Sequence, residues 1–241
     1  MDQRSLQILK IEKKQVLIIG LLACSCTIFY FQAINSKFYN LAFIILSLNF
    51  YSYLTYLSKK VMKWALLCVL LTVIIFTLSP AKKIDTAELK RTYLSKLPNY
   101  EGVSYVWGGE NSLGIDCSGL ARRAYRDALF TYTLKNLNSG ALREFLANWW
   151  WDSSAEAMSQ GYRDYLKPIG LDGTIKTLHY ENLEPGDIAI TADGVHMLVY
   201  LGEELWIQAD PVAEKVIIRN GIEDKNSWFD DQVKIYRWSR I

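Results

Sequence analysis

Cysteine and histidine are scarce in this sequence. Cys24, Cys26 and Cys68 fall within long apolar runs, so the rest of the chain keeps Cys117 alone and cannot form an internal disulfide. One such cysteine and two distant histidines provide no cluster of the spacing that zinc requires. We therefore expect neither a metal nor a cofactor. A single thiol outside the apolar runs indicates a reactive cysteine.

An excess of charge of one sign is also missing. The chain has 27 Lys and Arg residues against 25 Asp and Glu residues, which gives a formal net charge of +2. It contains no tract of basic residues with interleaved aromatics. Nucleic acid binding requires such a basic footprint, so we expect no nucleic acid partner.

Long apolar runs, by contrast, dominate the first third of the chain. Three of them, separated by short polar breaks, occupy residues 15–33, 39–57 and 61–79. A helix crosses a bilayer core of about 30 Å with roughly 20 residues, because each residue adds about 1.5 Å. We predict that residues 1–80 form a membrane anchor of three transmembrane helices.

The middle run is the least regular of the three. It contains Asn40, Asn49 and Ser52, whose side chains can bond to neighbouring helices in a membrane bundle. Loss of this span would move the C-terminal residues to the other side of the membrane. A cleaved signal peptide is the competing interpretation of the first run, but the two later runs favour a retained anchor.

The basic residues that flank the runs predict an orientation. A three-span arrangement places one set on the first side of the membrane, namely Arg4, Lys10, Lys13, Lys14, Lys59, Lys60 and Lys63. Fewer fall on the second side, namely Lys37, Lys82 and Lys83. Cytoplasmic segments carry the excess of Lys and Arg. We therefore predict a multi-pass protein of the cell membrane whose residues 81–241 lie outside the cytoplasm.

Residues 81–241 change in periodicity from helical to strand-like along the chain. Apolar spacing predicts helices over residues 85–97, 117–129, 142–151 and 155–166. Short β-branched and aromatic runs predict strands over residues 188–191, 195–201, 205–209, 216–219 and 233–238. Helices followed by short antiparallel strands are typical of an α+β domain.

The stretch YVWGGENSLGIDCSGL, residues 105–120, places Cys117 where a glycine-punctuated loop becomes a helix. The unpaired N–H groups and the dipole at a helix N-terminus favour a thiolate. We therefore expect a lowered pKa for Cys117 and a nucleophilic role. A small buried cysteine is the structural alternative.

A nucleophilic cysteine usually needs a base, and only two histidines are available. His196 follows Asp193 and Gly194 at the start of a predicted strand, whereas His179 precedes a loop. Gln208, on the next predicted strand, is the candidate that holds the imidazole of His196. A core histidine and a solvent-facing glutamine are the alternatives for these two residues.

Four strings together identify a family resemblance: YVWGG with GIDCSGL, LEPGDIAI, GVHMLVYLG and LWIQADP. Over residues 85–238 the chain resembles the NlpC-type cell-wall endopeptidases, which are papain-like cysteine peptidases that cut peptidoglycan stem peptides. The resemblance implies a papain-like fold and a peptidoglycan peptide as substrate. It also implies that the backbone N–H of Cys117 contributes to an oxyanion hole.

The resemblance further implies roles for individual residues. Cys117 corresponds to the nucleophile, His196 to the base, and Gln208 to a third polar residue that is commonly His, Asn or Gln in the family. Substrate-contacting positions fall on Tyr105, Asp116, Trp107 and Ser118. Asp116 is placed to meet the free amine of a stem peptide.

Two questions stay open at the level of sequence. The Trp-rich insertion at residues 130–170 can be a lid, a glycan-gripping surface or simply the core of two added helices. The chemistry can be peptide hydrolysis through a thioester, or acyl transfer or amide cleavage on a lipid or other amide substrate. A binding module without activity is the third hypothesis.

Overall fold

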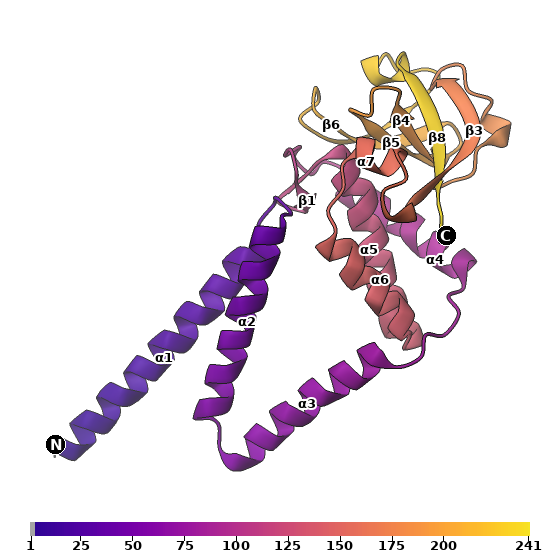
Figure 1. Ribbon diagram of the computed structural model, residues 1–241. Coiled ribbons are helices and arrows are strands. Elements are labelled where there is room, and N and C mark those ends of the chain that lie inside the picture. Colours follow the sequence, from indigo (N-terminus) through magenta and orange to yellow (C-terminus); the bar gives the residue numbers. More distant parts are fainter. Residues whose placement is uncertain (1–2) are drawn as a thin grey trace. The chain divides into compact units, whose positions relative to one another are not determined.

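Three long helices make up the N-terminal part of the protein: α1 Gln3–Tyr30, α2 Lys37–Leu57 and α3 Lys60–Leu78 (Figure 1). The computed structural model describes residues 3–241, with side chains described from residue 14 onward. The chain divides into two units. One comprises residues up to Gln32 together with Ser36–Leu78, and the other comprises Ala33–Asn35 together with Ser79–Ile241.

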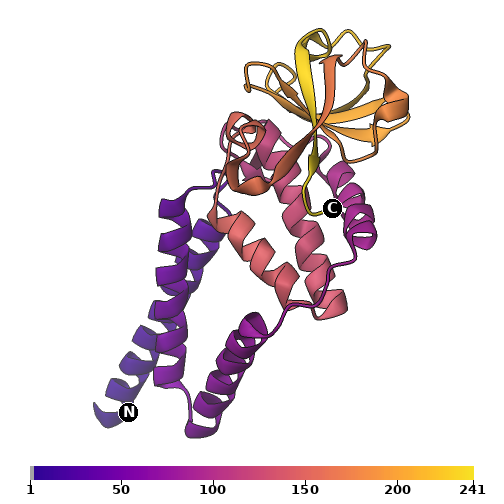
Figure 2. The same cartoon turned by 45° about the vertical axis from the view of Figure 1, so that its right-hand side comes forward.

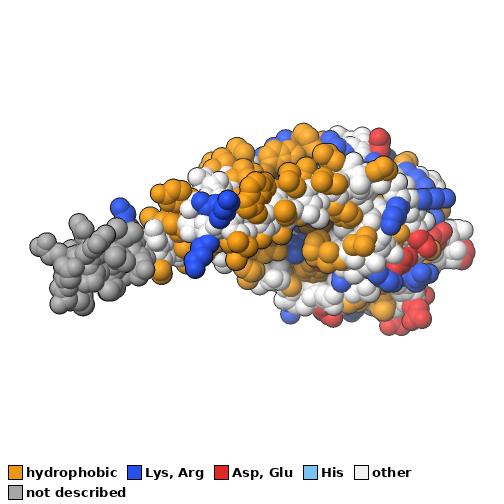
Figure 3. All heavy atoms as spheres, turned by 90° about the horizontal axis from the view of Figure 1, so that it is seen from below, with side chains coloured by type: hydrophobic (Ala, Val, Ile, Leu, Met, Phe, Trp, Pro, Cys, Tyr) orange, Lys and Arg blue, Asp and Glu red, His pale blue; other side chains and the backbone are white. Residues whose placement is uncertain are grey.

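The helices of the first unit are apolar along most of their length. Among the described residues, α2 and α3 are long and apolar enough to span a membrane, and Lys14–Tyr30 of α1 is a shorter apolar stretch. Many apolar side chains of the protein lie at its surface, as Figure 3 shows for one face. The side chains of Arg4, Lys10 and Lys13, which entered the prediction of orientation, lie outside the described residues.

The second unit begins with helices. These are α4 Thr86–Lys96, α5 Cys117–Asn136, α6 Ser139–Trp150 and α7 Ala155–Ser159, with short 3-10 turns at Leu97–Tyr100, Tyr162–Asp164, Tyr180–Asn182 and Ser227–Phe229. Asp85 caps α4, because its side chain accepts the N–H of Glu88 at 3.0 Å. Helix α5 is longer than predicted, because buried Tyr132 and Thr133 continue its apolar face.

A six-stranded antiparallel sheet follows the helices, in the order β3-β8-β4-β5-β6-β7. Its strands are β3 Leu166–Thr174, β4 Ile188–Thr191, β5 Met197–Gly202, β6 Leu205–Asp210, β7 Lys215–Asn220 and β8 Gln232–Trp238. A small hairpin, β1 Glu110–Asn111 and β2 Gly114–Ile115, precedes α5. Helices followed by an antiparallel sheet confirm the predicted α+β class.

The predicted helix over residues 155–166 is wrong in its second half. Helix α7 ends at Ser159, and Leu166 opens strand β3, which pairs with β8. Strand β3 contains Pro168 and lies at the edge of the sheet, and its register shifts between Pro168 and Asp172. Proline is tolerated at a sheet edge, where one side of the strand donates no ladder bonds.

The main core lies between the helices and one face of the sheet. Tyr125 of α5 stacks on Trp238 of β8 with ring centroids 4.3 Å apart, and Tyr93 of α4 meets Trp238 edge-on at 6.1 Å. Helices α4 and α5 lie against the sheet in both ribbon views (Figure 2). Burial of these rings fixes α5, and with it Cys117, against the strands.

Candidate active site

Cys117 is the first residue of α5, and a glycine-containing loop closes over the start of this helix. Asp116 caps the helix: one carboxylate oxygen accepts the N–H of Gly119 at 2.6 Å and the other accepts the N–H of Gly108 at 2.8 Å. A Cβ on Gly119 would lie 2.1 Å from the carbonyl oxygen of Gly109. Only glycine permits this approach, so the loop and the cap together fix the backbone of Cys117.

The thiol of Cys117 is almost enclosed, with 7% of the residue exposed. Its Sγ lies 3.9 Å from the carbonyl oxygen of Val195, two residues before β5 begins. Burial raises the pKa of Cys117 to about 12, the charge of Asp116 adds to the rise, and the N–H groups of Met197 and of the helix start oppose it. The expected lowering of this pKa is therefore wrong, because desolvation of the thiolate outweighs the helix N-terminus.

His196 lies directly before β5 and is also buried, with 2% of the residue exposed. Its Nε2 is 2.6 Å from Oε1 of Gln208 on β6, and its ring stacks on Trp228 with centroids 4.1 Å apart. Its backbone N–H donates to Oγ1 of Thr191 at 2.9 Å. When Nε2 carries the proton, it donates to Gln208 and leaves the lone pair of Nδ1 free to accept a proton.

The charge state of this imidazole follows from its burial. Burial lowers the pKa of His196 to about 4, although Gln208, Asp210 and Asp193 act in the opposite direction. Gln208 is neutral, so it orients the ring without supplying the charge that would favour the imidazolium. With the thiol pKa raised as well, the resting site at neutral pH holds a neutral thiol and a neutral imidazole.

The four remaining predicted site residues fall in two places. Tyr105 lies near the thiol: burial raises the pKa of its hydroxyl to about 12, and the charges of Cys117 and Asp116 contribute to that rise. Ser118 is buried and its Oγ donates to Asp116 at 3.0 Å. Trp107 is 75% exposed and belongs to the solvent-facing side of the same loop.

Asp116 is strongly engaged by its own surroundings. Its two oxygens accept from the N–H groups of Gly119 and Gly108 and from the hydroxyl of Ser118. Burial raises its pKa, and these three donors oppose the rise. The carboxylate therefore holds the loop to the helix, whatever contact it makes with a substrate amine.

A family model described as the NlpC/P60 family matches residues 102–237, which is more than half of the chain. The chain belongs to the NlpC/P60 family. This confirms the resemblance that the sequence motifs indicate. No curated protein matches the sequence.

Solved structures of NlpC/P60 proteins are similar to this chain at low identity. NlpC1 from Trichomonas vaginalis is 18% identical, with a TM-score of 0.42 over 67% of this chain and 48% of that chain. The peptidoglycan hydrolase RipB from Mycobacterium tuberculosis is 17% identical, with a TM-score of 0.37 over 66% of this chain and 69% of that chain. An NLP/P60 protein similar to a lipoprotein from Staphylococcus aureus is 18% identical, with a TM-score of 0.40 over 66% and 44%. This chain thus spans about half of the Trichomonas protein.

Sequence reasoning missed one residue of this NlpC/P60 site, Trp228, which covers the imidazole of His196. Asp210, at the end of β6, holds Trp228 through Asn226. Nδ2 of Asn226 donates to Asp210 at 2.7 Å, and Oδ1 of Asn226 accepts the N–H of Trp228 at 3.0 Å. Trp228 lies in a 3-10 turn without periodicity, so no pattern indicated it. The other histidine, His179, is 78% exposed at its side chain and lies 3.1 Å from Glu181.

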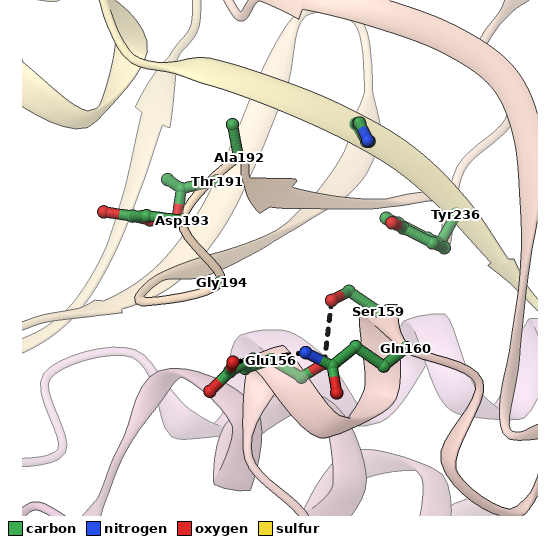
Figure 4. Close-up of a pocket in the computed structure, with 9 residues that line it drawn as sticks. Glu156, Ser159, Gln160, Thr191, Ala192, Asp193, Gly194 and Tyr236 are labelled. Carbon is green, nitrogen blue, oxygen red and sulfur yellow. Dashed lines mark hydrogen bonds between the residues drawn. The ribbon is translucent and has the colours of Figure 1, made fainter.

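Residues 155–160 reach the turn that leads to His196. A pocket of about 250 Å³ lies there, and one of its walls is formed by Glu156 and Ser159 of α7 and by Gln160, which follows this helix (Figure 4). Tyr236 and the turn at Thr191 to Gly194 face them. A Cβ on Gly194, where φ is +74°, would lie 2.8 Å from the Cβ of Glu156. Helix α7 therefore packs directly on this turn.

The aromatic residues between residues 130 and 170 differ in burial. Phe145 and Tyr162 pack against the main core and Tyr165 is buried within it. Trp149, Trp150 and Trp151 are half-buried. This region thus contributes to the core through some of its rings and keeps the three tryptophans partly at the surface.

Proposed function

We propose that this chain is a membrane-anchored cysteine endopeptidase that hydrolyses peptide bonds in peptidoglycan stem peptides. NlpC/P60 proteins are in general cysteine peptidases or amidases that act on peptidoglycan. The observation that carries the proposal is the 2.6 Å contact between Nε2 of His196 and Oε1 of Gln208. It holds the imidazole with Nδ1 available, beside the strand start against which the Cys117 thiol lies.

The proposed reaction has two halves. Sγ of Cys117 attacks the carbonyl carbon of the scissile peptide bond while Nδ1 of His196 takes the thiol proton. The C–N bond then breaks, His196 returns that proton to the leaving amine, and a thioester remains. Water attacks the thioester, giving a proton to His196, and the C–S bond breaks to release the carboxyl product. The proton on His196 returns to the sulfur.

The start of α5 supplies the electrostatic part of this mechanism. Negative charge develops on the carbonyl oxygen in both tetrahedral intermediates, and the backbone N–H of Cys117 at the helix N-terminus is the proposed donor to it. Because thiol and imidazole are both neutral at rest, proton transfer and attack proceed together in this proposal. Gln208 keeps the tautomer correct during both halves, and Tyr105 borders the substrate beside the thiol.

The apolar helices are the basis for the proposed location of the protein in the membrane. Helices α2 and α3, with the apolar stretch of α1, would cross the bilayer three times, with the N-terminus in the cytoplasm and the catalytic unit outside. Peptidoglycan lies on that side of the membrane. Alkaline phosphatase fused to the C-terminus should be active in cells, because it folds outside the cytoplasm. An inactive fusion would contradict the orientation.

The purified full chain, incubated with defined muropeptides and read by mass spectrometry, tests the proposal. Unmodified protein should release two peptide fragments, and Cys117→Ala should release none. Cys68→Ala, which changes a free cysteine of α3, is the matched control and should retain full activity. Equal fragment release by Cys117→Ala, or release of a fatty acid in place of peptides, would refute it.

A further inference from the structure

The residues that join α1 to α2 belong to the same unit as the candidate active site. The N–H of Asn35 donates to the carbonyl of Gly108 at 3.0 Å, and the N–H of Glu110 donates to the carbonyl of Ala33 at 2.8 Å. Ile34 pairs with Gly109 as an antiparallel bridge. Ala33–Asn35 therefore adds a short extended segment to the loop that precedes Cys117.

This segment completes a series of hydrogen bonds that ends at the nucleophile. The peptide groups on both sides of Gly108 are held: its carbonyl accepts from Asn35 and its N–H donates to Asp116 at 2.8 Å. The carbonyl of Gly109 accepts the N–H of Asp116 at 3.0 Å. Asp116 is the cap of α5 and precedes Cys117, so a shift of Asn35 is passed on through two peptide groups.

The side chain of Asn35 makes a second connection, to a buried group of charges. Its Nδ2 donates to Oε2 of Glu110 at 2.6 Å, and the same oxygen accepts from Nη1 of Arg126 at 2.5 Å. The other oxygen of Glu110 lies 2.5 Å from Nη1 of Arg122. These three charged side chains are each at most 5% exposed. Both arginines are on α5, five and nine residues after Cys117.

We propose that Ala33–Asn35 is a positioning segment for the active site. It holds Gly108 through its backbone and Glu110 through Asn35, and both hold the start of α5. The segment connects α1 and α2, which are two of the three helices proposed as membrane spans, so the connection between these spans contributes to catalytic geometry. This inference rests on the proposed function for its substrate, and the geometric part is tested without substrate below.

Asn35→Ala in the full chain, purified in detergent micelles, tests the effect on turnover. Misplacement of a reacting group by about 1 Å costs up to roughly a hundredfold in rate, and the backbone bonds of the segment remain, so we expect kcat to fall about tenfold with KM little changed. The kcat of Asn35→Asp should fall further, because this substitution places a second carboxylate beside that of Glu110. Ser36→Ala is the matched control. Ser36 accepts the N–H of Tyr39 at 3.3 Å as the cap of α2 and belongs to the other unit.

Alkylation of Cys117 by iodoacetamide gives a readout that does not depend on substrate. In a background with Cys24, Cys26 and Cys68 changed to serine, only Cys117 reacts. A loosened loop lets solvent reach the thiol, so Asn35→Ala should react faster and at lower pH than Ser36→Ala. If neither the unmodified chain nor the two variants cleave muropeptides, the proposed function fails. The alkylation rates of Cys117 then decide by themselves whether Ala33–Asn35 positions the active site. Equal alkylation profiles and equal kcat in Asn35→Ala and Ser36→Ala would overturn it.

Discussion

Helices α3 and α5 have nearly the same length, but α3 exposes apolar side chains whereas α5 buries charged ones. Helix α3 has 19 residues, most of them apolar, and none is buried. Helix α5 has 20 residues, and Arg122 and Arg126 are among those it buries. The environment of a residue in this protein therefore does not follow from its polarity alone.

The difference shows what each helix requires from its surroundings. The two arginines of α5 are buried together with partners: Arg122 meets Glu110 and the carbonyls of Asn148 and Trp151, and Arg126 meets Glu110. Val61, Val69 and Leu78 of α3 are 82%, 63% and 76% exposed. Such a surface is unfavourable in water, and this supports the proposal that α3 lies in a bilayer.

The largest effect is expected where the buried charges of α5 lose a partner. Arg122→Ala leaves Glu110 with less compensation in the interior, and breaking a buried pair in this way costs about 3–5 kcal/mol. The adjacent Arg123→Ala is the matched control. It removes a half-exposed pair with Asp127 four residues later, which is worth about 0.3–0.5 kcal/mol. Urea unfolding followed by tryptophan fluorescence measures both. Similar decreases in unfolding free energy in the two variants would show that breaking the buried pair costs no more than breaking the half-exposed one.

The sequence alone was sufficient for those parts of the structure that depend on local pattern. The five later strands and Cys117 at the start of α5 follow from periodicity and turn residues. The family strings indicated His196 and Gln208, which the structure places in contact.

What the sequence could not supply depends on distant residues. The pKa of Cys117 follows from how many atoms enclose it, and strand β3 forms because β8, about 65 residues later, pairs with it. Trp228 reaches His196 through a loop fixed by Asp210 and Asn226. None of these partners leaves a local signal in the sequence around it.

A second large effect is expected from the buried imidazole as pH changes. The pKa of His196 is lowered from about 6.5 to about 4, so between these values the unfolded chain binds the proton and the folded chain does not. The titration of His196 therefore leaves the free energy of unfolding at its full value above about pH 6.5. As the pH decreases toward 4, this free energy falls by on the order of 3 kcal/mol.

Unfolding free energies at several pH values check this dependence. His196→Gln should lose the slope between pH 6.5 and 4 that arises from this group, while His179→Gln, whose native side chain is exposed, should retain it. A slope that survives in His196→Gln with unchanged size would place the titration elsewhere in the protein.

A charge placed on α3 tests the other half of the comparison. Arg at the centre of a membrane span costs about 2.5–3.5 kcal/mol of insertion free energy, whereas on a surface in water it costs little. Val69→Arg should therefore reduce the fraction of protein that resists alkaline extraction from membranes. Val212→Arg is the matched control, since Val212 is 75% exposed in the second unit. If both variants stay equally in the membrane fraction, α3 does not lie in lipid.

The smallest effect is expected from the group that holds the imidazole. Gln208→Ala removes the acceptor for Nε2 of His196 and frees the ring, which we expect to lower kcat about tenfold, a part of the 10²–10⁴-fold that a positioned base contributes. Gln208→Glu keeps the acceptor and adds a negative charge, which raises the pKa of the neighbouring imidazole. The acidic limb of kcat/KM against pH should therefore move to higher pH in Gln208→Glu, and the rate at neutral pH should stay near that of the unmodified chain. An acidic limb that does not move would show that His196 does not titrate in the reaction, and would place the base outside this pair.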